Sequence, residues 1–384
     1  MESDVIIIGA GVLGVSLAFH LGNQGTRVIL LERETTPAVH SSGNNAGMIR
    51  HLYRHPQLTE WTKRSVALWP DEIRSKYFRK TGSIIAGRTA PFHHTELFSE
   101  ANYIQRSEAE MREIPAVYTP DDGLLDSGGY VNALYRMTNK NFVTGFFNTA
   151  VSSVQRCSGY WEVQTADGRM FYAPWLVNAA GAWLNSFVQP HYPWLCVNAK
   201  PYARHLFVIH GWEENFMPAA NCGFFWDEAG GWYLRLWEND SRLVSICDKV
   251  PVEDPNKFTP PAETADQLAV TLLRALPDVA EKLSLGQSWH CFRTYTDDML
   301  PMFGEDRDVS GLFWFAAFGG FGMSTSFAAA LDAASIICGE RIEITADFSP
   351  ERAKTTPMPQ RLKASVAAGH HKTNASADRT RVIL

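Results

Sequence analysis

Three glycines near the start of the chain have the spacing of a nucleotide-phosphate site. Gly9, Gly11 and Gly14 follow the apolar run 5–8 and precede residues 15–21, whose apolar positions have helical spacing. In this pattern the first glycine permits a tight turn, the second lets a pyrophosphate approach the backbone, and the third lets the helix pack on the strand. The free N–H groups at the start of the helix then attract the phosphates.

Glu32 provides the second part of this pattern, because it ends another apolar run, 28–31. A carboxylate there accepts hydrogen bonds from ribose hydroxyls and disfavours the 2′-phosphate of NADP. The residues therefore predict a bound adenine dinucleotide; a glycine-rich turn without a ligand is the alternative. An NAD domain would continue with regular βαβ repeats, whereas here the irregular segment 37–49 follows and a second glycine turn enters a helix at 318–324. That arrangement favours FAD, lying between two distant chain segments.

The composition of the 384 residues, with 45% hydrophobic and 20% charged, is typical of a globular protein with a large core. The net charge is −6 and no long basic run occurs, so nucleic-acid and anionic-membrane partners are disfavoured. The 6 cysteines form no CxxC pair, which predicts neither a disulfide framework nor a metal site and favours a reducing compartment. The longest apolar stretch, 5–19, is short for a membrane span. We therefore expect a cytoplasmic protein without stable membrane insertion.

The elements that must position these residues form two kinds of sheet. Strands are expected at 151–154, 160–165, 175–178 and 311–317 and, with one-sided alternation typical of an antiparallel sheet, at 205–209, 231–237 and 242–247. Helices are expected at 58–69, 262–276 and 324–338. The expected fold is α/β: a doubly wound Rossmann-like FAD-binding domain built from discontinuous segments, with an α+β substrate domain containing an antiparallel sheet. The FAD-binding domain is assigned to 1–85, 140–200 and 284–350, the substrate-binding domain to 86–139 and 201–283, and a weakly ordered tail to 351–384.

Five motifs together resemble the FAD-dependent D-amino-acid oxidase, glycine oxidase and sarcosine oxidase family, also called the DAO or DadA-like family. They are GAGVLG with Glu32, SSGNNAG at 41–47, VNAAGAW at 177–183, FRTYTDDMLP at 292–301 and FGGFGM at 318–323. They occur in the family's order, so the resemblance covers about residues 3–350.

The resemblance implies a set of FAD-binding residues. Those that hold the ADP half are Gly9, Gly11, Gly14, Glu32 and Arg33. The segment beside the pyrophosphate and the flavin ring contains Ser42, Asn45, Ala46 and Gly47. Val151 matches the position whose backbone meets the adenine, and the segment that closes over the nucleotide contains Ala180, Gly181 and Trp183. Those at the flavin pyrimidine edge are Gly319, Gly320, Gly322 and Met323. A helix N-terminus there would stabilise negative charge on the ring; a plain strand-to-helix turn is the alternative.

Arg293 matches the family arginine that binds the substrate carboxylate. A guanidinium forms two parallel charge-assisted hydrogen bonds to a carboxylate, which fixes the orientation of the substrate. The alternative is an arginine paired with Asp297 or Asp298 for stability. Cys291 falls where the sarcosine oxidases carry a flavin-linked cysteine, and a buried core cysteine is the alternative there.

Arg50 falls near the sarcosine-oxidase arginine beside flavin N5, with a solvated surface arginine as the alternative. Tyr233 and Arg235 share one face of a predicted strand, which is either the pocket face or a solvent face. The positions of the oxygen-activating and carboxylate-binding lysines of sarcosine oxidases fall at about Val244 and Ser324, which puts sarcosine as substrate in doubt.

The implied activity is oxidation of the Cα–N bond of a small amino acid or N-alkyl amino acid. Hydride passes to flavin N5, and the imino acid hydrolyses to a 2-oxo acid. The alternatives are a 2-hydroxy-acid or glycerol-phosphate dehydrogenase of the same fold, and a flavin-bearing subunit of a larger complex. The expected partners are a small amino-acid-like substrate, oxygen or a quinone as electron acceptor, and a second copy in a homo-oligomer. Arg293, Arg50 and Tyr233 are the predicted catalytic residues.

Overall fold

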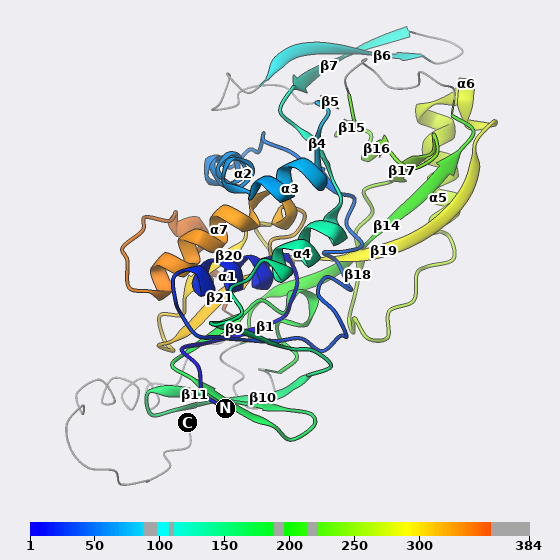
Figure 1. Cartoon of the computed structure of the whole chain (residues 1–384). Helices are drawn as coiled ribbons and strands as arrows, with labels where there is room; N and C mark the ends of the chain where they lie inside the picture. Colours follow the sequence, from blue (N-terminus) through cyan, green and yellow to red (C-terminus); the bar gives the residue numbers. More distant parts are fainter. Residues whose placement is uncertain (88–97, 107–110, 188–195, 213–221, 355–384) are drawn as a thin grey trace, which may run out of the picture.

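A six-stranded sheet forms the centre of the computed structural model, which describes residues 1–87, 98–106, 111–187, 196–212 and 222–354 (Figure 1). In sheet order its strands are β20 (Met302–Glu305), β21 (Leu312–Ala316), β13 (Trp175–Asn178), β1 (Val5–Ile8), β2 (Val28–Leu31) and β9 (Val143–Phe146). All neighbours are parallel except β20 and β21. Every residue of β1 and β2 is buried, as expected for parallel strands that are covered on both faces.

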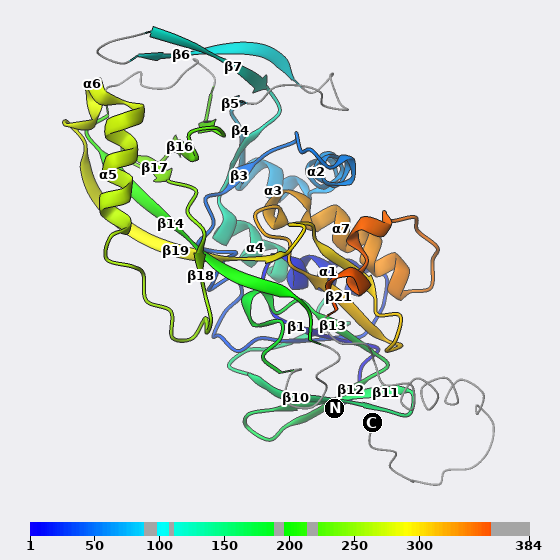
Figure 2. The same cartoon turned by 180° about the vertical axis from the view of Figure 1, so that it is seen from behind.

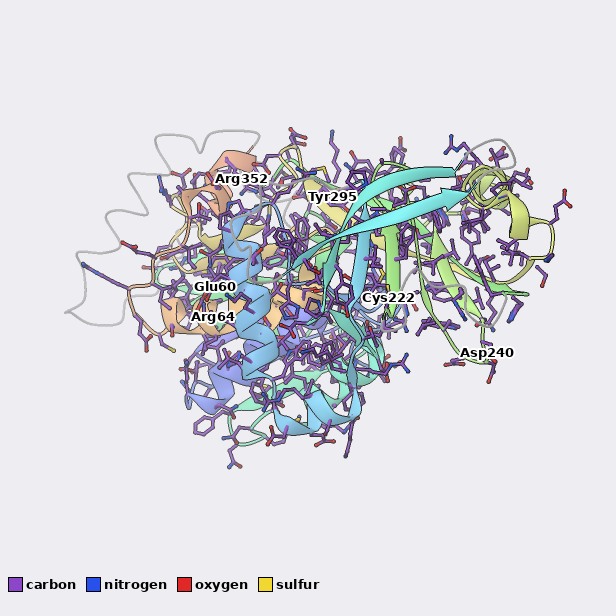
Figure 3. The ribbon with its side chains drawn as sticks, turned by 90° about the horizontal axis from the view of Figure 1, so that it is seen from above. Glu60, Arg64, Cys222, Asp240, Tyr295 and Arg352 are labelled. Atoms are coloured by element: carbon purple, nitrogen blue, oxygen red, sulfur yellow. The ribbon has the colours of Figure 1, made fainter. Side chains whose placement is uncertain are left out.

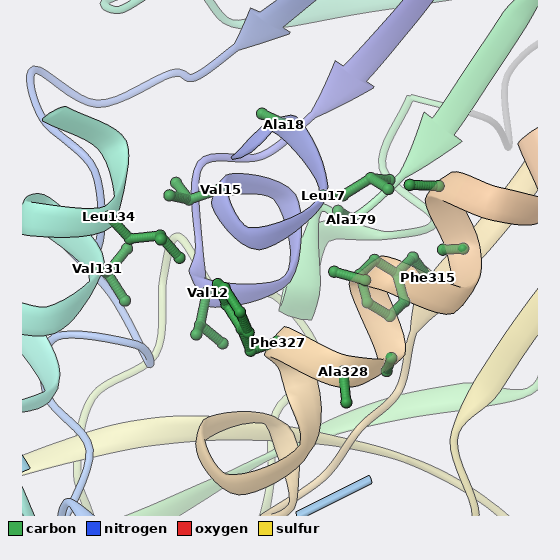
Figure 4. Packing of buried hydrophobic residues seen from close by; sticks show 14 of the residues in the cluster. Val12, Val15, Leu17, Ala18, Val131, Leu134, Ala179, Phe315, Phe327 and Ala328 are labelled. Carbon is green, nitrogen blue, oxygen red and sulfur yellow. The ribbon is translucent and has the colours of Figure 1, made fainter. Parts of the chain in front are cut away.

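Helices cover one face of this sheet. α1 (Val12–Asn23) packs against α4 (Ser127–Arg136) and α7 (Gly322–Ile337), and α2 (Pro56–Leu68) packs on α7. Figure 4 shows Val15 of α1 beside Leu134 of α4, and Val12 beside Phe327 of α7. The chain reaches this layer from both ends, so the N-terminal and C-terminal glycine turns lie at the same edge of the sheet.

A three-stranded antiparallel sheet covers the opposite face. It consists of β10 (Val151–Cys157), β11 (Tyr160–Thr165) and β12 (Met170–Ala173). Ile6 of β1 packs with Trp161 and Phe171 in one buried cluster. The expected Rossmann-like domain is confirmed, with a β-layer on its second face.

A nine-stranded sheet forms the second part of the molecule. Its strands are β18 (Val250–Pro251), β14 (Ala199–His210), β17 (Arg242–Ser245), β16 (Trp232–Leu236), β15 (Phe224–Asp227), β5 (Ser83–Ala86), β7 (Met111–Thr119) and β6 (Ser99–Arg106), with β19 (Ser284–Thr296) paired to β14. All pairs are antiparallel except β5 with β15, so the predicted antiparallel sheet is confirmed. Figure 2 shows β14 and β19 running together from α5 (Thr264–Ala275) to the six-stranded sheet.

The two faces of this sheet have different surroundings. Phe207 and Val244 face α5 and α6 (Pro277–Ala280) in one cluster with Leu268. Leu206 and Tyr233 alternate with them and face the other way, toward the 43–47 segment. A small sheet joins the two parts; its strands are β3 (Met48–Ile49), β8 (Gly123–Leu125) and β4 (Phe78–Lys80). In the chain, α3 (Asp71–Lys76) precedes β4, and α4 follows β8.

The three predicted helices 58–69, 262–276 and 324–338 correspond to α2, α5 and α7. The predicted domain boundaries stay a prediction, but strand pairing crosses them: β19 and most of β5 lie in segments assigned to the FAD-binding domain and pair within the large sheet. β19 crosses the predicted boundary because it is a long strand that pairs with β14 along its whole length.

The predicted tail, 351–384, begins inside an ordered element. η4 (Ala346–Phe348) and η5 (Pro350–Ala353) follow α7, and Lys354 forms ion pairs with Asp306 at 2.8 Å and Asp308 at 3.1 Å. The rest of the tail, from residue 355, lies outside the described residues.

Within the described ranges no helix has the length and apolar character to cross a membrane. Figure 3 shows Glu60 and Arg64 on α2, with Cys222 beside the strands of the large sheet.

Candidate functional site

A cavity of about 190 Å³, partly open to solvent, lies at the carboxyl ends of β1 and β2. Its lining includes the predicted residues Gly9, Gly11, Glu32, Arg33, Ser42, Val151, Ala180, Gly181 and Trp183. In an open parallel sheet, this edge is where ligands bind. The residues predicted to hold the ADP half and the adenine therefore lie together, apart from Gly14, which is the packing glycine.

The glycines let the backbone cross closely here. Gly9 has φ +103°, and a Cβ on it would lie 2.5 Å from the Ala179 oxygen; a Cβ on Gly14 would lie 2.0 Å from the Gly9 oxygen. Gly11 is the N-cap of α1, whose first turn holds no acidic residue, and the next N–H, of Val12, donates to Ser42 at 3.0 Å. The helix N-terminus therefore presents N–H groups and positive partial charge, as a pyrophosphate requires.

The Glu32 carboxylate is held in place by the backbone. One oxygen accepts from the N–H of Ala10 at 2.7 Å and the other from the N–H of Glu34 at 3.0 Å. Each carboxylate oxygen has a second acceptor site, which is available to ribose hydroxyls. The donor set and the close backbone turn fit the ADP part of FAD.

A polar network surrounds the rim of this cavity. Arg33 lies 4.5 Å from the Trp183 ring centroid, and Asn256 accepts from both Arg33, at 2.8 Å, and the Trp183 indole, at 3.0 Å. His40 and Arg33 both bond to Glu34 and hold the pKa of its carboxyl below the usual value, against the effect of burial. Asn256 was missed by the sequence reasoning, because it comes from the loop between β18 and α5 and no local pattern marks it.

The segment 45–47 forms a turn beside the large sheet. The Asn45 side chain accepts from the Gly47 N–H at 2.9 Å, and Gly47 has φ +64° with a Leu125 oxygen 2.1 Å from the position of a Cβ. Arg235 of β16 donates to the Ala46 oxygen. Burial and nearby Arg79 lower the pKa of Arg235 to about 10. A second cavity, of about 350 Å³, is lined by Asn45, Arg79, Asp126, Arg235 and Glu238.

The C-terminal glycine turn comes to the start of α1. A Cβ on Gly322 would lie 3.6 Å from the Val12 side chain, so the first turns of α7 and α1 are neighbours. Gly319 has φ +49°, and the Tyr295 ring fills the space where a Cβ would be, 2.3 Å away. The predicted residues of this turn are Gly319, Gly320, Gly322 and Met323. Both glycine motifs therefore contribute helix N-termini to one region.

Arg293 points at this turn from β19. A Cβ on Gly320 would lie 3.1 Å from one terminal nitrogen of its guanidinium. The Nε atom is enclosed and has no hydrogen-bond partner within the described part of the chain. Enclosed donors without acceptors are costly, so a cation placed in this way favours an anionic partner.

The alternative partners predicted for Arg293 are occupied elsewhere. Asp298 pairs with Arg352 at 2.6 Å, and Asp297 accepts from Asn198. Asp298 is buried only in part, and Arg352 and nearby hydroxyl and N–H donors lower its pKa to about 2 despite that burial. Among the described residues, no carboxylate forms an ion pair with Arg293.

Tyr233 and Cys291 lie on the same face of the sheet as Arg293. Tyr233 is 0% exposed and its hydroxyl has no hydrogen-bond partner among the described residues. Burial raises the pKa of both side chains, and the cations of Arg293 and Arg204 oppose that effect. The face that carries Tyr233 is therefore not a solvent face, which removes one alternative.

Arg50 is buried, at 8% exposed, so the alternative of a surface arginine is wrong. Its guanidinium carbon lies 4.3 Å from the Trp226 ring centroid and 4.8 Å from that of Tyr53. Its backbone N–H donates to the Ser324 hydroxyl at 3.4 Å, at the start of α7.

Val244, the position matched to the oxygen-activating lysine of sarcosine oxidases, lies on the face of the sheet that points away from Tyr233 and Arg293. Val244 packs toward Leu268 of α5, whereas its neighbour Leu243 faces the site. A shift of one residue exchanges the faces of a strand, and the sequence does not fix that register. Ser324 does lie at the site, buried at 1% exposed.

Comparison with protein families gives one matching model. Residues 4–336 match the DAO model, described as FAD dependent oxidoreductase. Among curated proteins, the chain is 23% identical to "Pyruvate dehydrogenase phosphatase regulatory subunit, mitochondrial" of Mus musculus, over 84% of the chain and 40% of that protein. It is 27% identical to "Monomeric sarcosine oxidase" of Arthrobacter sp. (strain TE1826), over 47% of the chain and 52% of that protein. The chain spans about half, or less, of the length of these relatives.

Solved structures share the fold. L-proline dehydrogenase from P. horikoshii has a TM-score of 0.77 at 19% identity, covering 91% of this chain and 97% of that one. Glycine oxidase from Geobacillus kaustophilus has a TM-score of 0.75 at 21% identity, covering 92% and 100%.

Proposed function

The chain belongs to the DAO family of FAD-dependent oxidoreductases, and from that premise we propose that it oxidises the Cα–N bond of a small amino acid or N-alkyl amino acid. The family assignment confirms the resemblance of the five motifs and makes FAD the cofactor. The relatives named above are oxidases and dehydrogenases of such compounds, apart from the one named as a regulatory subunit.

Arg293 is the observation that carries this proposal. Its guanidinium makes no hydrogen bond to an oxygen atom of the described residues, and it lies against the turn that leads into α7. Two parallel hydrogen bonds to a substrate carboxylate would satisfy it and set the direction of the Cα–H bond.

The protein's own side chains bind and orient the substrate. When bound, FAD supplies the acceptor, at N5, for the hydride that leaves Cα. Tyr233 offers a hydroxyl that has no partner in the described part of the chain, on the same face as Arg293. Aromatic side chains around it, Trp226 among them, exclude water, which favours the neutral amine form of the substrate. The imino acid then takes up water and hydrolyses to a 2-oxo acid and the amine.

The positive end of α7 favours the same ligand. α7 has 16 residues, and its N-cap, Phe321, offers no side-chain acceptor to the first N–H groups. An anion near this end is stabilised by about 0.3–1 kcal/mol. Together with Arg293, it makes this region selective for anionic ligands.

Anaerobic mixing of the FAD-loaded protein with a panel of substrates tests the proposal. The panel contains D-, L- and N-methyl amino acids, and 2-hydroxy acids and glycerol phosphate as the rival class. We expect amino acids to bleach the visible absorbance of the flavin and the rival class to leave it unchanged. Bleaching by hydroxy acids alone would replace the proposal by the dehydrogenase alternative. No bleaching at all, with a partner protein co-purifying, would favour a flavin-bearing subunit.

Three further expectations stay predictions. The electron acceptor is oxygen or a quinone, which turnover with each acceptor separates. A homo-oligomer is tested by mass measurement in solution. A covalent bond from Cys291 to FAD predicts that the flavin stays with the protein after denaturation in acid.

A further inference from the structure

The turn 43–47 connects the start of α1 with the start of α7. Just before the turn, the Ser42 hydroxyl accepts from the N–H of Val12 in the first turn of α1. Just after it, the N–H of Arg50 donates to the hydroxyl of Ser324 in the first turn of α7. The turn itself belongs to no helix or strand. Its shape must therefore be fixed by contacts with other parts of the chain.

The large sheet supplies donors to this turn from two places. The Trp289 indole, on β19, donates to the Asn44 oxygen at 3.0 Å, and the Arg235 guanidinium, on β16, donates to the Ala46 oxygen. The Trp237 ring joins the two donors: its centroid lies 5.7 Å from that of Trp289 and 4.8 Å from the guanidinium carbon of Arg235. These three side chains, Arg235, Trp237 and Trp289, form a clamp on the backbone of the turn.

Arg235 is held at two points of its guanidinium. Its Nε donates to the Leu236 oxygen at 2.9 Å, and a terminal nitrogen donates to the Ala46 oxygen. Among the described residues no carboxylate forms an ion pair with it, so its acceptors are backbone oxygens. A hydrogen bond from a charged donor is about twice as strong as one between neutral groups. The bond from Arg235 therefore holds the turn more strongly than the bond from the neutral Trp289 indole.

The same guanidinium leaves no room for a side chain at Gly47. Gly47 has φ +64°, and a Cβ on it would lie 2.8 Å from a terminal nitrogen of Arg235 and 3.1 Å from the Ser127 hydroxyl oxygen. The glycine lets the backbone of the turn lie directly against the guanidinium. Movement of the turn toward β16 would meet Arg235, and movement away from β16 would break the bond to Ala46.

Ala46 connects the clamp with the substrate side of the sheet. Its side chain is buried in one cluster with Tyr233, Leu206 and Cys291, while its oxygen accepts from Arg235. Tyr233 and Arg235 are two positions apart on β16 and share one face of that strand. One strand therefore presents Tyr233 to the substrate region and Arg235 to the turn.

We propose that Arg235 is a positioning residue that holds the turn 43–47 in the conformation that binds FAD. This rests on the proposed function and on the predicted contact of Asn45, Ala46 and Gly47 with the cofactor. Arg235 acts through the Ala46 oxygen and not by touching the substrate. Without it the turn populates other conformations, and the affinity for FAD falls with the fraction that stays competent to bind.

Amide hydrogen exchange of the FAD-loaded full chain tests this positioning. The N–H of Asn44 donates to the His40 oxygen at 2.9 Å, and the N–H of Gly47 donates to the Asn45 side chain at 2.9 Å, so both report on the turn. We expect Arg235→Met to speed their exchange about tenfold or more, the worth of one hydrogen bond from a charged donor. The rate constant of FAD dissociation, followed by flavin fluorescence after dilution, should rise by a similar factor.

Arg242→Met is the matched control. Arg242 lies on the neighbouring strand β17, is buried, and donates to the backbone oxygens of Asp240 and Ser241 in its own hairpin. It loses the same charge from the same sheet without contacting the turn, so exchange at 43–47 and FAD dissociation should not change. Arg235→Lys keeps the charge but cannot bond to both backbone oxygens, so it should give values between wild type and Arg235→Met. It also provides the comparison if Arg235→Met does not fold.

Reduction kinetics distinguish positioning from substrate binding. With FAD in excess, we expect Arg235→Met to lower the rate constant of flavin reduction at saturating amino acid about tenfold, because the turn no longer fixes the cofactor. The half-saturating amino-acid concentration should change less than about threefold, because Arg293 still binds the carboxylate. A rise in that concentration with unchanged exchange would make Arg235 a substrate-binding residue and overturn the proposal.

The remaining outcomes separate this proposal from the one on which it rests. Unchanged exchange at 43–47 in Arg235→Met, or in Arg235→Lys where methionine prevents folding, overturns it. Equal acceleration in Arg242→Met, or throughout β15 and β16, overturns it as well, because the effect would then be general loosening of the sheet. The exchange decides even where FAD does not dissociate. If no amino acid reduces the flavin of the wild-type protein, the proposed function fails, while exchange at the turn still decides the role of Arg235.

Discussion

Replacing Arg293 by methionine is expected to raise KM for the amino-acid substrate about a hundredfold or more while FAD stays bound. Each hydrogen bond to a charged group contributes about 1.5–3 kcal/mol, so two parallel bonds contribute about 3–6 kcal/mol. At about 1.4 kcal/mol per factor of ten, this corresponds to about a hundredfold to ten-thousandfold. We expect the lower part of this range, because Arg50 is near and retains some attraction for the carboxylate.

The same substitution should not destabilise the protein without substrate. The Arg293 guanidinium has no carboxylate partner among the described residues, so methionine removes an enclosed cation at no cost in ion pairing. Arg64→Met provides the contrast. Arg64 forms two hydrogen bonds to Asp332, at 2.7 Å and 2.9 Å, and Asp332 is 3% exposed. Its loss leaves a buried carboxylate and should lower the free energy of unfolding by about 3 kcal/mol.

Steady-state kinetics with an artificial electron acceptor and thermal unfolding measure the two effects together. The flavin absorbance spectrum of each variant controls for loss of FAD. A KM near the wild-type value in Arg293→Met would remove Arg293 from substrate binding. A large fall in the unfolding temperature of that variant, equal to that of Arg64→Met, would show that Arg293 has a structural partner after all.

Three further predictions test the cofactor site and the core. Gly9→Ala should abolish FAD binding, because the new Cβ would lie 2.5 Å from the Ala179 oxygen. Gly168→Ala, at a glycine of similar φ with open space around it, should retain FAD. The ratio of flavin to purified protein measures both effects, and a normal ratio in Gly9→Ala would contradict the role of Gly9. Asn256→Ala removes two hydrogen bonds at the cavity rim and should speed FAD dissociation about tenfold, measured by flavin fluorescence after dilution; an unchanged rate contradicts the role of this residue. Burial lowers the pKa of His20 to about 4, below 6.5, so the unfolded chain binds the proton first as pH falls. Stability should therefore be complete above pH 6.5 and fall by about 3 kcal/mol toward pH 4, and His20→Phe should flatten that decrease in denaturant titrations.

The N-terminal site could be predicted because its parts are local in sequence. Gly9, Gly14 and Glu32 lie within one βαβ unit, and the clash distances at both glycines follow from the turn that this unit requires. The strands β1 and β2 are continuous apolar runs, so their burial on both faces was also evident. Spacing alone was sufficient wherever strand, turn and helix follow one another directly.

The rest of the site depends on contacts between distant segments. Asn256 is bonded to Arg33 across 223 positions, and no spacing rule connects them. Arg50 is buried because Trp226, on β15, covers it. The face of Val244 depends on strand register, where an error of one residue reverses the prediction. These features follow from how the two sheets meet, which a single sequence does not specify.

The arginines differ in whether they have an acceptor within the described part of the protein. Arg352, Arg204 and Arg64 all have carboxylate partners within the protein, and Arg235 donates to backbone oxygens. Arg293 has neither kind of partner among the described residues, and under the proposed function the substrate carboxylate offsets the cost of enclosing it. Part of the attraction for that anion is therefore built into the unliganded fold as unsatisfied hydrogen-bonding capacity. This is why the Arg293 substitution should weaken binding of the substrate and yet spare the stability of the protein.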